Sequence, residues 1–276
     1  MKRPVLLGLH ADAPFLYKWI LIFLPFIILI AIYLVASDIR LESNPSDKLL
    51  PSLTQMGDAI YQYAFTEDKR TGDILLWSDT ISSLRRLLIG VSLAAITGLF
   101  IGLNMGLFPS FSLMLNSFVT VISMIPPLAI LPILFITVGV GEAGKIMLIY
   151  LGTFPLIIRD VSMAAKQFPK EKIIKALTLG ASELAIVYKI VMPIILPRLI
   201  DSIRLVLGAA WLFLIASEAI SSSEGLGYRI FLVRRYLSMD IIIPYVLWIT
   251  LLGFLFDYVL ALISQKCFPW QSQKGR

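Results

Sequence analysis

The hydrophobic pattern divides the chain into apolar stretches long enough to cross a bilayer and polar segments that join them. The first stretch, residues 19–37, reads WILIFLPFIILIAIYLVAS and carries no charge. A second run, from Leu87 to Gly141, has no charged residue over 55 positions. A helix crosses the hydrocarbon core with about 20 mostly apolar residues, so this run predicts two spans. We expect the break between them at LFPSF, residues 107–111, because proline interrupts a helix.

Three further apolar stretches lie near residues 143–163, 194–217 and 241–264, each with a charge near one end. The whole pattern predicts an all-α, polytopic membrane helical bundle of about six transmembrane helices. No small-residue cleavage site follows the first span, so we expect that span to be retained rather than removed as a signal peptide. The predicted parts are an N-terminal segment with the first span (1–37), an external loop with short helices (38–79), a core (80–265) and a tail (266–276).

Composition favours the same class of protein and excludes several kinds of site. The chain is 58% hydrophobic and 15% charged, whereas a soluble domain carries about 25% charged residues. Its single Cys267 cannot form an intrachain disulfide, and a single histidine, His10, allows neither a two-histidine metal site nor a histidine-based triad near the spans. We find no basic run interleaved with aromatic residues of the kind that binds nucleic acid. We therefore expect no catalytic residue, metal site or cofactor-binding site in this chain.

The distribution of basic residues predicts the orientation. With both termini in the cytoplasm, the cytoplasmic parts hold 14 of the 24 lysines and arginines, eight of them from Arg159 to Arg204. The same orientation places 12 of the 18 acidic residues outside and five inside. Cytoplasmic segments are enriched in lysine and arginine, so we expect the termini and the segment 159–204 to be cytoplasmic.

The longest cytoplasmic segment is amphipathic, although it lies between two apolar spans. It contains KQFPKEKIIKALTLGASELAIVYKIVMP, residues 166–193. Gly180 permits a sharp change of backbone direction, and Pro193 suits the first turn of the next helix. We expect two short helices at 169–190, lying across the inner surface and joined near Gly180. Such a segment either contacts a partner or lies on lipid headgroups without one. One apolar face is defined by residues at helical spacing: Ile173, Leu177, Ala181 and Leu184.

This segment resembles the cytoplasmic signature of binding-protein-dependent ABC importer permeases. That signature reads Glu-Ala-Ala, three residues, Gly, nine residues and then Ile-x-Leu-Pro. Met192 replaces the leucine, whereas Ile174 and Lys175 stand where the glutamate and the first alanine are usual. The missing glutamate would normally help to fix the coupling helix. The positions that match in register are Ala176, Gly180, Ile190 and Pro193.

Other stretches are similar to the nitrate, sulfonate, taurine and bicarbonate branch of the same family. They are SLRRLLIGVSLAAITGLFIGL (83–103), IPPLAILPILFITVGVGEAGKIMLI (125–149) and IRLVLGAAWLFLIASEAISSSEGLGYRI (203–230). LLPSLTQM, FTEDKRTG and FLVRRYLSMDIIIPYVLWIT resemble permeases of urea-carboxylase or guanidine-related systems. The resemblance covers roughly residues 75–265. It implies the transmembrane fold of a type I ABC importer in the inner membrane, acting as a homodimer on a small polar solute.

The resemblance also implies the partners. The chain has no G-x-x-x-x-G-K-[ST] phosphate loop, so a separate cytoplasmic ATPase dimer would bind ATP and Mg²⁺. A periplasmic or lipid-anchored binding protein would deliver the solute, and closure of the ATPase pair would drive alternating access. The residues expected to couple to the ATPase are Ile173, Ala176, Leu177, Gly180, Ala181, Ser182, Leu184 and Pro193.

Candidate residues of the translocation path come from polar or helix-breaking positions at membrane depth. The prolines of IPPLAILP, residues 125–132, free backbone groups that need protein or a water-filled cavity around them. Glu218 either contacts solute or simply pairs with Arg229 or a helix terminus; a guanidinium solute would favour the first role, and Glu224 with it. Snorkelling to the membrane surface accounts for Arg85 and Arg86. The candidates are Ser123, Pro126, Pro127, Ser217, Glu218 and Ser221.

Two other classes of protein compete with this interpretation. A secondary transporter without an ATPase would usually show paired inverted repeats with matching helix breaks, and only one proline break is evident. An integral membrane enzyme would need a cluster of histidines, cysteines or acids at membrane depth, which the sequence lacks. Co-purification of a nucleotide-binding subunit separates an ABC permease from both.

Overall fold

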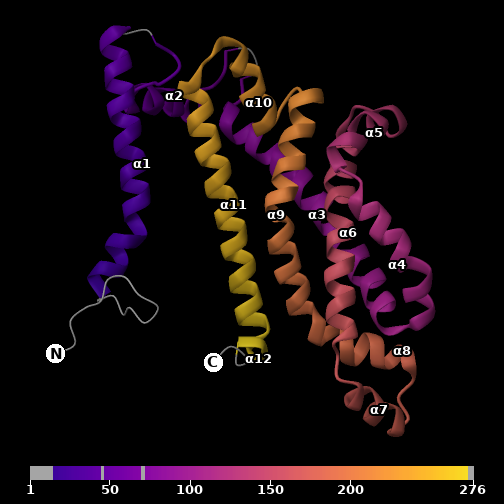
Figure 1. Ribbon diagram of the computed structural model, residues 1–276. Helices are drawn as coiled ribbons and strands as arrows, with labels where there is room; N and C mark the ends of the chain where they lie inside the picture. Colours follow the sequence, from indigo (N-terminus) through magenta and orange to yellow (C-terminus); the bar gives the residue numbers. More distant parts are fainter. Residues whose placement is uncertain (1–14, 45–46, 70–71, 273–276) are drawn as a thin grey trace, which may run out of the picture.

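The computed structural model describes residues 15–44, 47–69 and 72–272, and these residues form helices and loops without a strand. His10 and the last residues of the expected tail, 273–276, lie outside this range. The predicted all-α membrane bundle is confirmed, since five helices are long and apolar enough to span a bilayer. Figure 1 labels these helices, which are α1 (Phe15–Ser43), α3 (Leu75–Leu107), α6 (Glu142–Lys166), α9 (Met192–Ser221) and α11 (Met239–Cys267).

A sixth span is broken. The helix α4 (Pro109–Met124) is followed by a 3₁₀ turn, η1 (Pro127–Ile130), and by α5 (Leu131–Thr137), which is bent from α4 by 84°. The expected break at LFPSF is confirmed, because α3 ends at Leu107 and proline occupies the first turn of α4. The bend itself falls at Ile125 and Pro126, where proline removes a backbone donor.

The core of the bundle is the parallel pair α3 and α6. Small residues on α3 let the two backbones approach closely, as is common between membrane helices. A Cβ atom added to Gly98 would lie 2.7 Å from Cγ2 of Ile157, and one added to Gly102 would lie 2.8 Å from Cβ of Val161. On the other side of α6, the ring of Phe213 on α9 fills the space left by Gly152. These contacts lock three helices together.

The two ends of the bundle carry different short elements (Figure 1). One end holds α7 (Lys170–Thr178) and α8 (Glu183–Ala185), together with the C-terminal end of α11 and α12 (Pro269–Ser272). We call residues 170–185 the hairpin and this end the hairpin end. The far end holds α2 (Leu53–Phe65), α5, α10 (Leu226–Val233) and the 3₁₀ turn η3 (Arg234–Tyr236).

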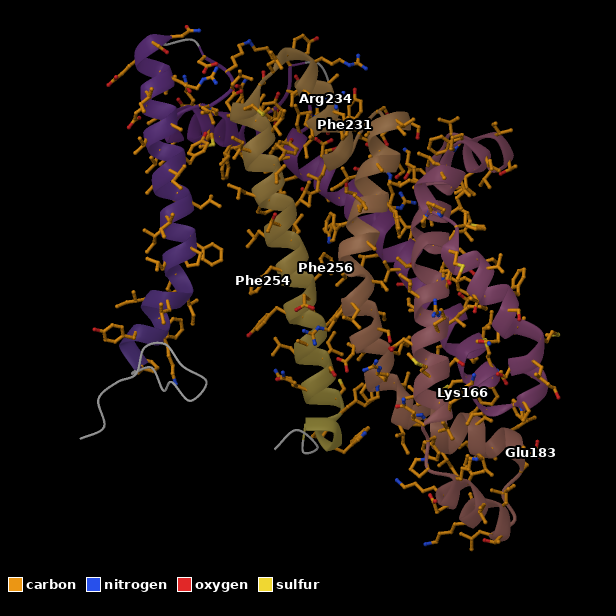
Figure 2. The ribbon with its side chains drawn as sticks, in the orientation of Figure 1. Lys166, Glu183, Phe231, Arg234, Phe254 and Phe256 are labelled. Carbon is orange, nitrogen blue, oxygen red and sulfur yellow. The ribbon has the colours of Figure 1, made fainter. Side chains whose placement is uncertain are left out.

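Helix α11 lies at the edge of the bundle with one face toward it. Figure 2 shows Phe254 and Phe256 on opposite sides of α11. Phe256 packs against the core, whereas Phe254 is 68% exposed. At the far end α2 covers α11 and begins with a capping box, in which Ser52 and Gln55 bond each other's backbone N–H groups. Tyr63 and Tyr245 meet edge to face between the two helices.

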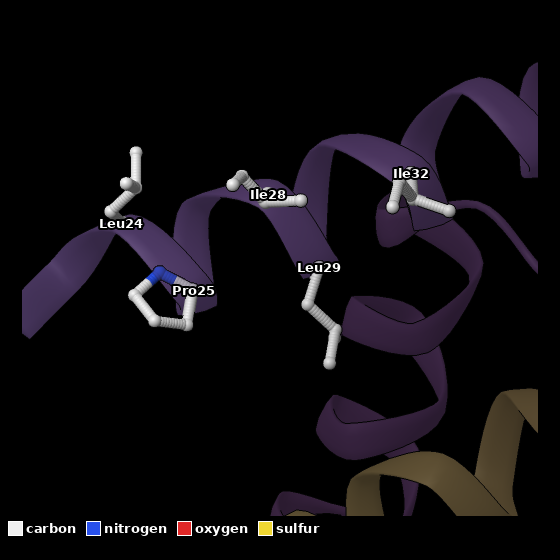
Figure 3. A pocket seen from close by; sticks show the side chains of 5 residues that line it. All are labelled: Leu24, Pro25, Ile28, Leu29 and Ile32. Atoms are coloured by element: carbon white, nitrogen blue, oxygen red, sulfur yellow. The ribbon is translucent and has the colours of Figure 1, made fainter.

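Helix α1 stands apart from the other spans in Figure 1. Only 6% of its most apolar stretch of 18 residues is buried against the rest of the structure. The hydroxyl of Tyr33 donates to the carbonyl of Pro51 at 2.7 Å, and Ser37 donates to that of Leu50 at 3.0 Å. Around Pro25 one face forms an open hollow of about 490 Å³, lined only by aliphatic side chains of α1 itself (Figure 3). Such a surface is stable only against lipid or protein.

Candidate functional site

The hairpin turns sharply at Gly180, whose φ of +84° lies in the left-handed region that favours glycine. The N–H of Gly180 donates to the carbonyl of Leu177 at 2.9 Å, and the N–H of Ala181 donates to that of Ala176 at 3.0 Å. This pair of hydrogen bonds is a Schellman motif, which ends α7 and satisfies two of its last carbonyls. The sequence expectation of a turn at this glycine is confirmed.

Beyond the turn the chain enters one long helix. The hydroxyl of Ser182 accepts from the N–H of Ala185 at 3.3 Å and caps α8. A π-helical segment, η2 (Ile186–Val191), then continues directly into α9, so that Glu183–Ser221 is a single helix of 39 residues. The structure differs here from the expected second short helix, because neither Met192 nor Pro193 interrupts the backbone: Pro193 lies in the first turn of α9. Figure 2 shows Lys166 and Glu183 near the base of the hairpin.

The predicted coupling residues divide between the two sides of the hairpin. Ile173, Ala176 and Ala181 pack inward with the buried residues of α6 and α9. Leu177 and Leu184 are 45% and 62% exposed, and Gly180 and Ser182 lie exposed at the turn. Pro193 is partly buried.

Two exposed apolar side chains were not predicted: Ile174 at 59% and Leu179 at 79%. The resemblance gave a signal for Ile174, since it stands where glutamate is usual. Together with Leu177 and Leu184 they form an apolar surface, which we call the hairpin tip. A cleft of about 230 Å³ separates part of the hairpin from the α3–α4 turn. The hairpin tip therefore offers aliphatic side chains to whatever lies at this end of the bundle.

A buried ionic cluster, the far-end network, holds the opposite end together. Its centre is Arg86 of α3, whose side chain is 1% exposed. Nε and Nη2 donate to the two carboxylate oxygens of Glu142 at 2.6 and 2.8 Å, and Nη1 donates to Oε1 of Glu218 at 2.7 Å. Glu224 completes the set with its carbonyl at 3.0 Å and its carboxylate at 3.4 Å. All five guanidinium N–H groups thus have an acceptor. The expectation that Arg86 snorkels to the surface is wrong.

Glu218 of α9 is fully buried within the far-end network. Besides Arg86, its carboxylate accepts from Ser83 Oγ at 2.8 and 3.0 Å and from the N–H of Gly227 at 2.9 Å. Gly225, with φ of +121°, passes so close that an added Cβ would lie 2.6 Å from Cδ of Glu218. The carboxylate is therefore enclosed by α3 and by the first turn of α10, whose positive dipole end favours negative charge.

A second carboxylate supports the same turn. Asp79 of α3 accepts from the N–H of Gly225 at 2.9 Å, from Nε of Arg229 at 2.8 Å and from the hydroxyl of Tyr245 at 3.3 Å. Arg229 thus pairs with Asp79, whereas the sequence suggested Glu218 as its partner. One signal was available: Asp79, Ser83 and Arg86 recur at spacings of four and three, which puts three polar residues on one helix face.

The structure places the predicted path residues in two environments. Ser217 and Glu218 are buried at the far end, and the hydroxyls of Ser217 and Ser221 bond backbone carbonyls of α9. Ser123, Pro126 and Pro127 lie at the bend of the broken span, where Pro126 is exposed. Ser123 accepts a hydrogen bond from Nη1 of Arg159 at 3.2 Å.

The apolar spans, the broken span and the exposed hairpin together define a polytopic subunit of a membrane transport system. Residues 91–268 match the model of the family described as binding-protein-dependent transport system inner membrane component. This match spans more than half of the chain, and the chain belongs to that family.

Relatives of known name agree with this assignment. The chain is 30% identical to the taurine transport system permease protein TauC of Escherichia coli over 201 residues, which are 73% of each chain. It is 28% identical to the putative aliphatic sulfonates transport permease protein SsuC of the same organism, over 92% of this chain and 94% of the relative. The bicarbonate transport system permease protein CmpB of Synechocystis is 29% identical, over 77% and 76%.

A solved structure has the same fold. The inward-facing MetNI methionine ABC transporter superposes with a TM-score of 0.61 at 20% identity, over 69% of this chain and 94% of that chain. Because so low an identity reports on architecture alone, the match supports the type I importer fold and does not bear on the solute. The predicted fold class is confirmed.

Proposed function

We propose that this permease subunit works as a homodimer coupled through its hairpin tip to a separate cytoplasmic ATPase dimer, which binds ATP and Mg²⁺. A periplasmic or lipid-anchored binding protein delivers a small polar solute of the taurine, sulfonate, bicarbonate or nitrate kind. Alternating access then moves the solute across the inner membrane. Both termini and the hairpin lie in the cytoplasm. The chain itself hydrolyses nothing.

The observation that carries the proposal is the hairpin tip at the end of a continuous helix. Four exposed aliphatic side chains lie on α7, on α8 and in the turn between them, and exposed apolar side chains clustered at one end of a protein mark a contact surface. The inward-facing residues of the hairpin pack on α6 and α9, so a force applied at the tip reaches the spans directly.

Co-expression with an ATPase subunit and a binding protein encoded beside this chain tests the partnership. The permease should elute with the ATPase in detergent, and reconstituted vesicles should accumulate solute only with ATP and binding protein present. Labelled taurine, an alkanesulfonate, bicarbonate, nitrate, urea and guanidinium form the solute panel. Accumulation without the ATPase would instead identify a secondary transporter, and the proposal would be withdrawn.

The natural cysteine tests the orientation. Cys267 is the only cysteine of the chain, is exposed, and ends α11 at the hairpin end. A membrane-impermeant maleimide should therefore label inside-out vesicles and leave right-side-out cells unlabelled. In a Cys267→Ser background, Leu179→Cys should give the same pattern. Labelling of either cysteine from outside would reverse the assigned orientation and remove the hairpin from the ATPase.

A further inference from the structure

Arg159, which the charge count assigned to the cytoplasm, instead lies within the membrane-spanning helix α6. On the parallel neighbour α3, Gly98 packs on Ile157 and Gly102 packs on Val161, so Arg159 lies at the level of Phe100. The charge-free part of α3 runs from residue 87 to its end at residue 107. Phe100 is seven residues from that end, a distance of about 10 Å at 1.5 Å per residue. The guanidinium is therefore carried by a position well inside the apolar zone, where an ionised group is costly.

Arg159 is exposed and has no acidic partner among the residues that the structure describes. Its neighbours on α9 and α6 are paired: Arg198 donates to both oxygens of Asp160 at 3.0 and 2.6 Å. Within the described part of the chain, no carboxylate oxygen lies within 4.0 Å of the Arg159 guanidinium. Exposed, uncompensated charge at this depth is tolerated where it faces a water-filled cavity rather than lipid.

Ser123 fixes where the guanidinium points. Its hydroxyl donates to the carbonyl of Thr120 at 2.8 Å, which leaves an oxygen lone pair for Nη1 of Arg159 at 3.2 Å. Ser123 is the second-last residue of α4, directly before the 84° bend. The remaining N–H groups of Arg159 have no acceptor among the described residues, and a guanidinium with free N–H pairs binds carboxylate, sulfonate or phosphate oxygens in a bidentate way.

The two buried carboxylates of the far end, Glu218 and Asp79, are occupied. Both oxygens of Glu218 accept hydrogen bonds from Ser83, Arg86 and Gly227, and both oxygens of Asp79 accept from Arg229. A guanidinium or ammonium solute would have to displace an internal arginine from these carboxylates.

We propose that Arg159, held by Ser123 at the bend of the broken span, binds the oxyanion group of the solute in the translocation path. This rests on the proposed function and deepens it, because it names the residue that recognises the carboxylate, carbonate, nitrate or sulfonate group of the solute and disfavours a cation. Ser123 is a positioning residue. The same chemistry would bind a lipid phosphate, and the tests separate the two sources.

The first test needs neither the solute nor the ATPase. Ser123→Cys in a Cys267→Ser background puts a thiol beside Arg159, and its modification rates by an anionic and a cationic methanethiosulfonate are compared in nanodiscs. A cavity lined by one sign of charge concentrates counter-ions about tenfold or more, so Arg159→Gln should lower the anionic-to-cationic rate ratio about tenfold. Arg159→Lys keeps the charge and should keep most of the ratio.

Arg85→Gln is the matched control, because it removes the same charge from α3 outside the charge-free run and should leave the ratio unchanged. Absence of reaction with both reagents would place Ser123 in lipid and overturn the proposal. An unchanged ratio in Arg159→Gln would overturn it equally. A ratio that falls only in nanodiscs of anionic phosphatidylglycerol, and not in neutral phosphatidylcholine, would assign Arg159 to lipid headgroups.

Uptake provides the second test. In vesicles with ATPase and binding protein, Arg159→Gln should reduce uptake of the transported anion at least about tenfold, the loss expected for one charge-assisted bidentate contact, while stability is unchanged. Arg159→Lys should recover part of the rate. Uptake of guanidinium by the unaltered protein, or undiminished anion uptake by Arg159→Gln, would refute the proposal. If the unaltered protein needs no ATP, the proposed function fails instead.

Discussion

Gly180 gives the sharpest prediction about coupling, because a substitution there changes the backbone of the hairpin turn without changing side-chain packing. Its φ is +84°, and no atom lies within 4 Å of a Cβ placed on it. A substituted side chain therefore clashes with nothing, and its only cost is the conformational energy of the left-handed backbone. For an ordinary L-residue that cost is about 1–2 kcal/mol. A β-branched residue pays more, since positive φ is a true outlier for it.

The energetic cost of the left-handed backbone should differ among three variants: Gly180→Ala, Gly180→Val and Gly180→Asn. A penalty of about 1.4 kcal/mol lowers the ratio of hairpin turn to open forms tenfold, so Gly180→Ala should weaken ATPase binding by at most about tenfold. Gly180→Val should abolish uptake. Asparagine tolerates the left-handed region, and Gly180→Asn should stay near the unaltered protein.

The assay is titration of the ATPase onto permease in nanodiscs, followed by ATP-dependent uptake in vesicles. Cys267 labelling checks that each variant is inserted in the same orientation. A change in the hairpin should not alter insertion, because the hairpin lies outside the spans. Equal ATPase affinity for the valine and asparagine variants would refute the reasoning, since it would show that the turn is not needed for docking. Loss of insertion in the valine variant alone would show that the turn acts in folding.

Three further predictions follow from other parts of the structure. Leu184→Asp, at a side chain 62% exposed on the hairpin tip, should remove ATPase binding in a pull-down while leaving the unfolding temperature unchanged. Arg86→Met should lower the free energy of unfolding by about 3–5 kcal/mol in denaturant titrations, because it leaves Glu218 buried without its cation; a loss below about 1 kcal/mol would contradict the geometry. Gly98→Val should disrupt α3–α6 packing and reduce the folded yield in size-exclusion chromatography, because its Cβ would lie 2.7 Å from Ile157; Gly208→Val, in open space, is the control.

Hydropathy and turn chemistry were sufficient to predict the spans of this chain and the position of the hairpin turn. The charge-free run from Leu87 to Gly141 predicted two spans and their break, because length and proline act locally. The turn at Gly180 was predictable for the same reason. The continuity of α8, η2 and α9 was not, since Pro193 at a helix start and Pro193 within a continued helix look alike in sequence.

The far-end network escaped prediction because its members are distant in sequence. Arg86 and Glu218 are 132 positions apart, and no local periodicity links them. An arginine at the edge of a span is usually explained by snorkelling, so its burial depends on which helices pack beside it. The pair of Arg198 with Asp160 is equally non-local, since 38 positions separate the two residues.

The continuous helix Glu183–Ser221 connects the hairpin to the far-end network. Its α9 part has 30 residues and extends about 45 Å at 1.5 Å per residue, with the hairpin joined to one end and Glu218 near the other. A helix of that length moves its free end by about 4 Å when it tilts by about 5°. Because Arg86 and Ser83 clamp Glu218 to α3, such a swing carries the neighbouring spans with it. Under the proposed coupling, a displacement of the hairpin would therefore tilt α9 and α3 as one unit.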